Sequence, residues 1–142
     1  MGERKSCTEV FKIGGGYFGG LREDTLAEET EGWVEAHHIP SREAITASKL
    51  YYENGGQLDD GNTPAILMDY DDHRLTASCG NEESANEYRK KQTELINAGK
   101  FLEAQKMDID DLRRNFGNKY DLFIAQAVEH TKHLQKLGYI DN

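Results

Sequence analysis

Apolar and polar positions follow different patterns in two parts of the chain. Through residue 80, apolar residues occur in short runs separated by glycine, proline and acidic residues, as in short strands and turns. From Asn81 onward, apolar residues recur every three or four positions, which is the spacing of amphipathic helices. The pattern predicts an α+β fold that is mostly helical overall. Its core is expected over residues 13–80, with a C-terminal helical subdomain over residues 81–142 packed on it.

Two segments in the first part predict strands. The segment WVEAHH at 33–38 is ended by Pro40, which cannot donate a backbone hydrogen bond to a sheet. The segment PAILMD at 64–69 is apolar on both faces, which predicts a buried strand. Between the strands, a serine start and an Asn-Gly-Gly end predict a helix over residues 41–56. The acidic start of residues 69–78 favours a short helix or turn.

Four helices are predicted in the second part, bounded by capping residues. They cover residues 81–99, 100–107, 108–117 and 120–138. Asp108 is expected to cap the third of them and Gly117 to end it. Arg89 and its basic neighbours are expected on the outer surface, where they could contact a DNA backbone.

The N-terminal region is the least regular. Residues 1–12 are expected to form a weakly ordered lead-in. Five glycines interrupt residues 13–24 and predict an irregular turn or hairpin with Tyr17 and Phe18 packed down. A phosphate-binding loop is the alternative, although no GK[ST] motif follows. The length is that of one domain, 1–142.

Composition narrows the class of protein. Hydrophobic residues make up 37% of the chain, no apolar run is long enough to span a bilayer, and no membrane contact is expected. The N-terminus is charged and lacks the apolar stretch of a signal peptide. Cys7 and Cys79 are too few for a disulfide framework and suit a reducing compartment. The net charge of −9 argues against a general nucleic-acid coat protein, although a bound cation could neutralise phosphate locally.

Two adjacent histidines, His37 and His38, end the first predicted strand of a chain that has five histidines in all. The pair alone could equally be an accident of a polar loop or part of a site. Consecutive side chains of a strand point to opposite faces, so the two rings could serve different roles. Asn62 comes just before the second strand, and His73 lies in the helix or turn after it. Taken singly, these two are a turn residue and a surface histidine, but the four together, in this order, favour a site.

This order of strand, histidine pair, asparagine, strand and helical histidine resembles the HNH nuclease fold, in which a ββα unit holds a metal ion. The tripeptide AHH and the segment MDYDDHRLTASCG further resemble HNH/endonuclease VII toxin domains at the C-termini of bacterial polymorphic toxins. The lead-in GGGYFGGLRED also resembles the segment before the histidine pair in such domains. The resemblance covers about residues 14–80 and implies a ββα-metal core within residues 13–80.

The resemblance also implies a role for each residue of the pattern. His37 would be a metal ligand, and His38 would be the general base that takes a proton from water. Asn62 would brace the loop so that the carbonyl or ring of His38 is held in place. His73 would complete the metal site, and Arg74 could contact the scissile phosphate.

The implied ligand set departs from many members of the family at one position. Their helix carries a second histidine four residues after the first, where this chain has Ala77. A carboxylate oxygen from Asp69 or Asp72 could fill the set. Fewer nitrogen and more oxygen ligands favour Mg²⁺ or Mn²⁺, with Zn²⁺ or Ni²⁺ as alternatives.

The function implied is that of a metal-dependent endonuclease, most simply a DNase toxin effector in interbacterial competition. Such a domain would be the C-terminal part of a larger secreted polypeptide, delivered by the producing bacterium and active in the cytoplasm of the target cell. A cognate immunity protein would block it. Two alternatives stay open: a ribonuclease toxin on the same scaffold, and a non-catalytic small acidic binding or immunity protein.

His130 and His133 lie three positions apart in the last predicted helix and could form a metal pair. They have no third ligand nearby in the sequence, so a solvated helix face is the expected reading.

Overall fold

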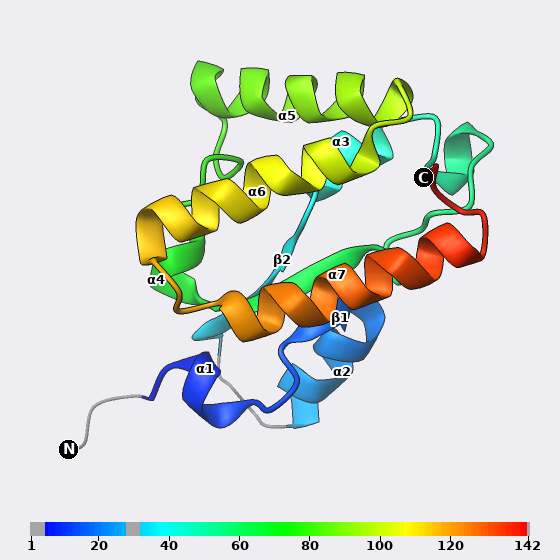
Figure 1. Ribbon diagram of the computed structural model, residues 1–142. Helices are drawn as coiled ribbons and strands as arrows, with labels where there is room; N and C mark the ends of the chain where they lie inside the picture. The colour runs from blue at the N-terminus through cyan, green and yellow to red at the C-terminus, as the bar shows by residue number, and fades with distance from the viewer. Residues whose placement is uncertain (1–4, 28–31, 142) are drawn as a thin grey trace.

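The computed structural model describes residues 5–27 and 32–141 and has the predicted mixed α+β composition (Figure 1). Helices hold most of the residues in its regular elements. The elements are α1 (Cys7–Val10), β1 (Gly15–Tyr17), α2 (Phe18–Ala27), β2 (Val34–His38), α3 (Arg42–Thr46), η1 (Tyr52–Asn54), β3 (Pro64–Asp69), α4 (Tyr70–His73), α5 (Glu83–Asn97), α6 (Phe101–Phe116) and α7 (Asp121–Lys136). In the described part of the chain, no helix combines the length and apolar character needed to cross a membrane.

The sheet has three antiparallel strands in the order β1-β3-β2, so β3 is central. Both predicted strands are confirmed, and the side chains of β3 are buried from Pro64 to Met68. In the pairing register His37 lies opposite Ile66 and His38 opposite Ala65, so the histidine pair is held against the most buried strand. The chain order β2, β3, α4 is strand, strand, helix, but α4 has only four residues.

The glycine-rich segment forms a strand and a helix, so the prediction of an irregular turn or hairpin is wrong. Glycine is needed here because β1 packs directly on α7. A Cβ atom on Gly15 would lie 1.8 Å from the backbone oxygen of Phe123, and one on Gly14 would lie 2.3 Å from the Phe123 ring. Phe18 packs against the core as expected, whereas Tyr17 is 52% exposed.

The predicted lead-in is ordered where the structure describes it, and residues 1–4 lie outside the described range. Ser6 caps the short helix α1 through its side chain, and Cys7 is fully buried. The backbone N–H of Cys7 donates to Asp69 Oδ1 at 2.8 Å, and the Ser6 hydroxyl donates to Asp69 Oδ2 at 2.7 Å. These bonds fasten the segment to the end of β3.

Helix α3 is much shorter than predicted and ends at Thr46. Polar side chains after it satisfy the backbone groups that a longer helix would have used. The Ser48 hydroxyl donates to Ile45 O at 2.7 Å, and Asn54 Nδ2 donates to the carbonyls of Thr46 and Ser48, both at 2.9 Å. The remaining residues of the predicted 41–56 helix form turns and the single turn η1.

Three long helices make up the C-terminal part and complete two apolar clusters. Helix α7 packs against β1 and β3, while α5 and α6 pack on each other and α5 also covers α3 (Figure 1). The two helices predicted over 100–117 are one continuous helix, α6, and Asp108 is not a cap. Asp108 is fully buried because Tyr88 and Gln92 of α5 donate to its carboxylate at 2.7 and 2.9 Å. A tertiary contact therefore overrides the local capping signal.

Candidate functional site

The histidine pair sits at the end of β2, and each ring contacts a different neighbour. The His37 side chain is buried, and its ring lies edge-on to the His73 ring with centroids 5.0 Å apart. The His38 ring stacks on Phe18 of α2, with centroids 4.6 Å apart. Strand β2 therefore supplies His37 and His38, and α4 brings His73 into contact with His37.

These three histidines line one cavity of about 200 Å³, which we call the histidine cavity. Arg42, Glu43 and Arg89 line it from the helical side. The cavity joins the strand end to the first residues of α3 and to the segment after α4. It is large enough for several water molecules.

Burial keeps both members of the pair neutral. Desolvation lowers the pKa of His38 to about 4, with the positive charge of Arg42 as the next cause. Desolvation also lowers the pKa of His37 well below its ordinary value, helped by His73 and His38. Within the described residues, neither the Nε2 of His37 nor that of His38 has a hydrogen-bond partner, although both atoms are buried. Buried polar atoms without partners are uncommon, and each calls for a physical reason.

Asn62 braces the loop beside His38. Its Oδ1 accepts from the backbone N–H of Asp59 at 2.8 Å, and its Nδ2 donates to Gln57 O at 3.0 Å. Asp60, in the middle of this loop, lies beside the His38 ring, and its carboxylate charge and its backbone both act to raise the pKa of that ring. The Asp60 carboxylate in turn binds Arg42 at 3.1 Å and the Tyr51 hydroxyl at 3.0 Å. Asn62 thus shapes the loop that holds the His38 ring.

Glu35 is a member of the site for which the sequence analysis gave no role. It binds His73 Nδ1 with one carboxylate oxygen and Arg74 with the other, the latter at 2.9 Å. Arg74 is half exposed and also lies over the Tyr70 ring, 4.3 Å from its centroid. The signal that could have identified Glu35 is its spacing, because residues i and i+2 of a strand share a face and Glu35 precedes His37 by two.

Asp69 and Asp72 do not join the histidines. They lie on the other side of α4, along a separate pocket of about 620 Å³ that includes neither His37 nor His73. Lys119 Nζ donates to Asp69 at 2.8 Å and to Asp72 at 2.7 Å, and the Tyr120 hydroxyl donates to Asp72 at 2.6 Å. Although burial alone would raise the pKa of Asp69, its hydrogen bonds from Cys7, Lys119 and Ser6 lower it. We call these residues the aspartate cluster: Ser6, Cys7, Asp69, Asp72, Lys119 and Tyr120.

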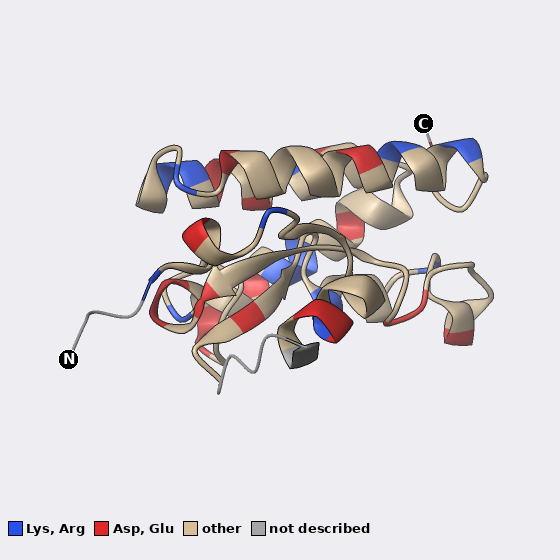
Figure 2. Ribbon diagram, turned by 90° about the horizontal axis from the view of Figure 1, so that it is seen from below, with Lys and Arg blue, Asp and Glu red and all other residues tan. Residues whose placement is uncertain are grey.

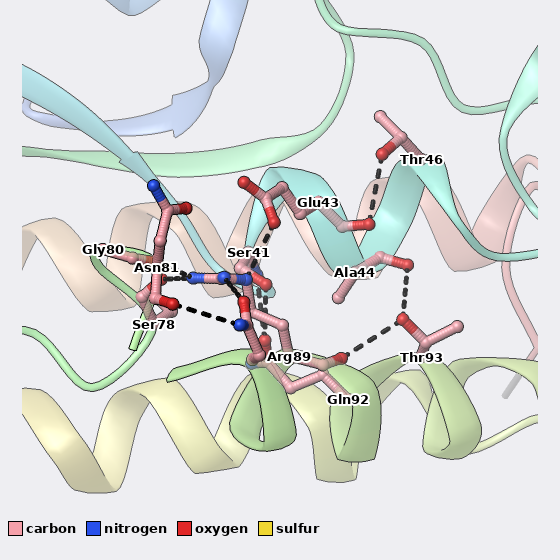
Figure 3. Close-up of polar contacts among 11 residues, drawn as sticks. Ser41, Glu43, Ala44, Thr46, Ser78, Gly80, Asn81, Arg89, Gln92 and Thr93 are labelled. Atoms are coloured by element: carbon pink, nitrogen blue, oxygen red, sulfur yellow. Dashed lines mark hydrogen bonds and ion pairs between the residues drawn. The ribbon is translucent and has the colours of Figure 1, made fainter. Parts of the chain in front are cut away.

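Arg89 lines the helical side of the histidine cavity. Figure 3 shows its polar contacts. Its Nε pairs with Glu43 at 2.9 Å, and one terminal nitrogen donates to the carbonyls of Ser78 and Gly80. Only 6% of Arg89 is exposed, so its predicted place on the outer surface is wrong. Through these contacts Arg89 holds α3 and the segment after α4 together.

The donors of the cavity fit a divalent ion through two imidazoles. His37 offers a buried Nε2 that has no partner in the described ranges, and Glu35 on Nδ1 leaves Nε2 as the ligating nitrogen of His73. A carboxylate behind a ligating histidine is a common way of orienting it. In the described part of the chain, no three His, Cys, Asp or Glu side chains are already arranged as a complete ligand set. Any ion would therefore take its remaining ligands from water or substrate.

Comparison of the chain with family models, with curated proteins and with solved structures found no match. The geometry of the histidine cavity is therefore the basis for a functional argument.

Proposed function

We propose that the chain is a metal-dependent endonuclease that hydrolyses phosphodiester bonds at the histidine cavity, with β2, β3 and α4 acting as a ββα-metal unit. The observation that carries the proposal is the neutral His38 ring. Its Nε2 has no hydrogen-bond partner among the described residues, and it borders the same cavity as the His37–His73 pair.

His38 has the properties of a general base. A base must be unprotonated at the working pH, and burial, which lowers the pKa of His38 to about 4, keeps the ring neutral but also makes it a weaker base than one with a pKa near the working pH. The loop braced by Asn62 and the stacked Phe18 ring fix the orientation of the imidazole. In the proposed reaction Nε2 accepts a proton from water as the oxygen attacks phosphorus and the bond to the leaving sugar oxygen breaks.

His37 and His73 would hold the divalent ion, with Glu35 orienting His73. When bound, the ion supplies positive charge for the phosphate and the leaving oxygen. Mg²⁺ and Mn²⁺ were favoured because Asp69 or Asp72 would add oxygen ligands, but neither lines the cavity. Two imidazoles suit Ni²⁺ and Zn²⁺ at least as well, so these alternatives gain weight.

Basic groups beside the cavity could bind the phosphate. Arg74 is 49% exposed next to His73, and Arg42 is 55% exposed next to His38. Each is paired with a carboxylate that a phosphate would have to displace or share. Basic and acidic residues alternate along the ribbon (Figure 2). Binding of a DNA phosphate would therefore depend on the basic side chains beside the cavity more than on the net charge of the chain.

The biological role follows from the same proposal. A DNase of this kind would serve as a toxin effector delivered as part of a larger secreted polypeptide, and a cognate immunity protein would cover the histidine cavity. A ribonuclease on the same scaffold is the second candidate, because every group named above acts on the backbone of the nucleic acid.

Degradation of purified plasmid DNA and of structured RNA tests the proposal. Each substrate is incubated with the wild-type chain in Mg²⁺, Mn²⁺, Ni²⁺ or Zn²⁺, and with EDTA. We expect cutting that requires a metal and is lost in His38→Ala. Cutting of RNA alone would identify the ribonuclease, and no cutting with any metal would favour the acidic binding protein.

A further inference from the structure

His130 on α7 contacts the Asn62 loop directly. Its Nε2 lies 2.6 Å from the backbone oxygen of Asn62, a contact between residues 68 positions apart. Because a carbonyl oxygen only accepts, Nε2 must carry the proton and donate it. The expected solvated histidine is therefore half-buried and bonded to a residue of the proposed site.

The loop that receives this bond is also held by hydrogen bonds among its own residues. Asp59 Oδ1 accepts from the backbone N–H groups of Gly61 and Asn62, both at 2.8 Å, while Asn62 Oδ1 accepts from Asp59 N. Gly19 of α2 adds a backbone bond to Gly61 O at 2.9 Å. The bond from His130 ties this small ring of interactions to α7, which is packed on the sheet.

A metal pair formed by His130 and His133 is not supported. Their ring centroids are 6.2 Å apart, the His130 Nε2 is already committed to Asn62, and His133 is exposed. No group of three metal-binding side chains includes them among the described residues. Tyr17 instead packs on His130, with centroids 5.5 Å apart. Burial lowers the pKa of His130, which favours the neutral ring with a single N–H.

We infer that His130 is a positioning residue, which holds the Asn62 loop, and thereby the loop residues beside the His38 ring, by donating Nε2–H to Asn62 O. This inference rests on the proposed function for its catalytic meaning. If so, helix α7 does not only support the fold but also helps to position the residues of the site.

Three variants separate the effect of the hydrogen bond from the effects of side-chain volume and of substituting any histidine of α7. His130→Leu keeps much of the volume and removes the donor. His130→Gln restores a donor, because the amide nitrogen of glutamine lies as many bonds from the backbone as Nε2 does. His133→Ala, on the exposed side of the same helix, is the matched control.

The first readouts need no catalysis. In the full chain we expect amide hydrogen exchange of Asp59, Gly61 and Asn62 to become several-fold faster in His130→Leu, as for the loss of one hydrogen bond. We also expect the ring-proton chemical shifts of His38, which lies on Phe18, to move. Both should return toward wild type in His130→Gln and stay unchanged in His133→Ala. Unchanged exchange and shifts in His130→Leu would overturn the inference.

The second readout is DNA cutting. His130→Leu should lower kcat by about 10- to 100-fold with little change in KM, because a slightly misplaced base costs rate rather than binding. The loss should not add to that of Asn62→Ala, since both act through one loop. Full additivity, or a Gln variant as slow as the Leu variant, would overturn the inference. A wild-type chain that cuts nothing would instead defeat the proposed function, and the exchange and shift data would still decide whether His130 holds the loop.

Discussion

The histidine cavity and the aspartate cluster are two polar sites at opposite sides of the short helix α4, and they differ in how their polar atoms are satisfied. In the aspartate cluster both oxygens of Asp69 accept hydrogen bonds, and Lys119 pairs with Asp69 and Asp72. In the histidine cavity the Nε2 atoms of His37 and His38 have no partner among the described residues. The first arrangement is complete, whereas the second has capacity left for a ligand.

This difference separates a structural cluster from a candidate site more clearly than residue type does. Leaving a buried polar atom without a partner costs about 1–3 kcal/mol, so a fold keeps such atoms where something else uses them. By residue type alone, the carboxylates of the aspartate cluster were as good a metal site as the histidines. Their ion pairs with Lys119 now give them a structural explanation.

The largest expected effect is in His38→Ala. Removing a general base should lower the cutting rate by ~10²- to 10⁴-fold. The fold should stay nearly intact, because the lost ring has a buried nitrogen that pairs with no group in the part of the chain that the structure describes. Plasmid degradation and thermal melting check the two halves of this prediction. Full cutting activity in the variant would show that the cavity does not use His38 as its base.

Metal titration should separate the two clusters directly. We expect His37→Ala and His73→Ala each to weaken binding of Mn²⁺ or Ni²⁺ by at least ~10-fold, without additive effects, because both act on one ion. Asp72→Asn is the matched control and should bind the metal like wild type. Calorimetry on the full chain measures all four proteins. A loss of affinity in Asp72→Asn would return that residue to the ligand set and break the comparison.

The stability of the fold, unlike metal affinity, should depend on the aspartate cluster. Asp69→Ala removes the acceptor of Ser6, Cys7 N and Lys119, which should lower the free energy of unfolding by roughly 1–3 kcal/mol. The same substitution should leave metal affinity unchanged. Denaturant unfolding gives the stability, with Asp71→Ala, on the exposed surface of α4, as the control. Equal stability of the two variants would mean that the cluster does not fasten α1 to β3.

The smallest expected effect tests a third polar group, Asp108, which is fully partnered yet buried. Burial raises its pKa from 3.8 to about 7, so the native state holds a proton that the unfolded state releases. The stability that this proton provides is present at low pH and is lost as the pH rises through 7.

The asparagine of the Asp108→Asn variant cannot lose a proton in this way. Between pH 5 and pH 8 the free energy of unfolding of wild type should therefore fall relative to that of the variant. The expected fall is about 2 kcal/mol. Unfolding at both pH values in matched buffers measures it, and comparison with wild type cancels the histidines, which titrate in both proteins. A constant difference would show that Asp108 is charged throughout this range.

Much of the fold could be predicted because it depends on local periodicity. The segment 33–38 ended by Pro40, the apolar run of 64–69 and the helical spacing after residue 81 each specify an element without reference to the rest of the chain. Local side-chain hydrogen bonds shortened the predicted helix over 41–56, and two further errors occurred where a distant contact decided the outcome. Asp108 has the sequence features of a cap but is held inside α6 by Tyr88, and the glycines serve a helix that follows more than a hundred residues later.

The site was predictable to the extent that strand geometry fixes it. His37, His38 and His73 do meet at one cavity, and Asn62 does lie in the loop beside His38. Asp69 and Asp72 were assigned to the metal because they are near His73 in sequence, but a helix turn sends neighbouring side chains in different directions. Glu35 and His130 were missed because their partners lie 38 and 68 positions away.

The close contact between β1 and α7 also has a consequence for how the chain acquires its structure. The side chain of Gln126 accepts hydrogen bonds from the N–H groups of Gly14 and Gly15, and the first of these spans 112 positions. Contacts of such high sequence separation form late, because closing the long loop between the two residues costs chain entropy before the contact can stabilise the fold. During synthesis, the edge strand of the sheet and the brace on the Asn62 loop must both wait until α7 has left the ribosome. A nascent chain that ends before α7 should therefore be unable to assemble the histidine cavity, and protease protection of stalled chains of increasing length would reveal the step.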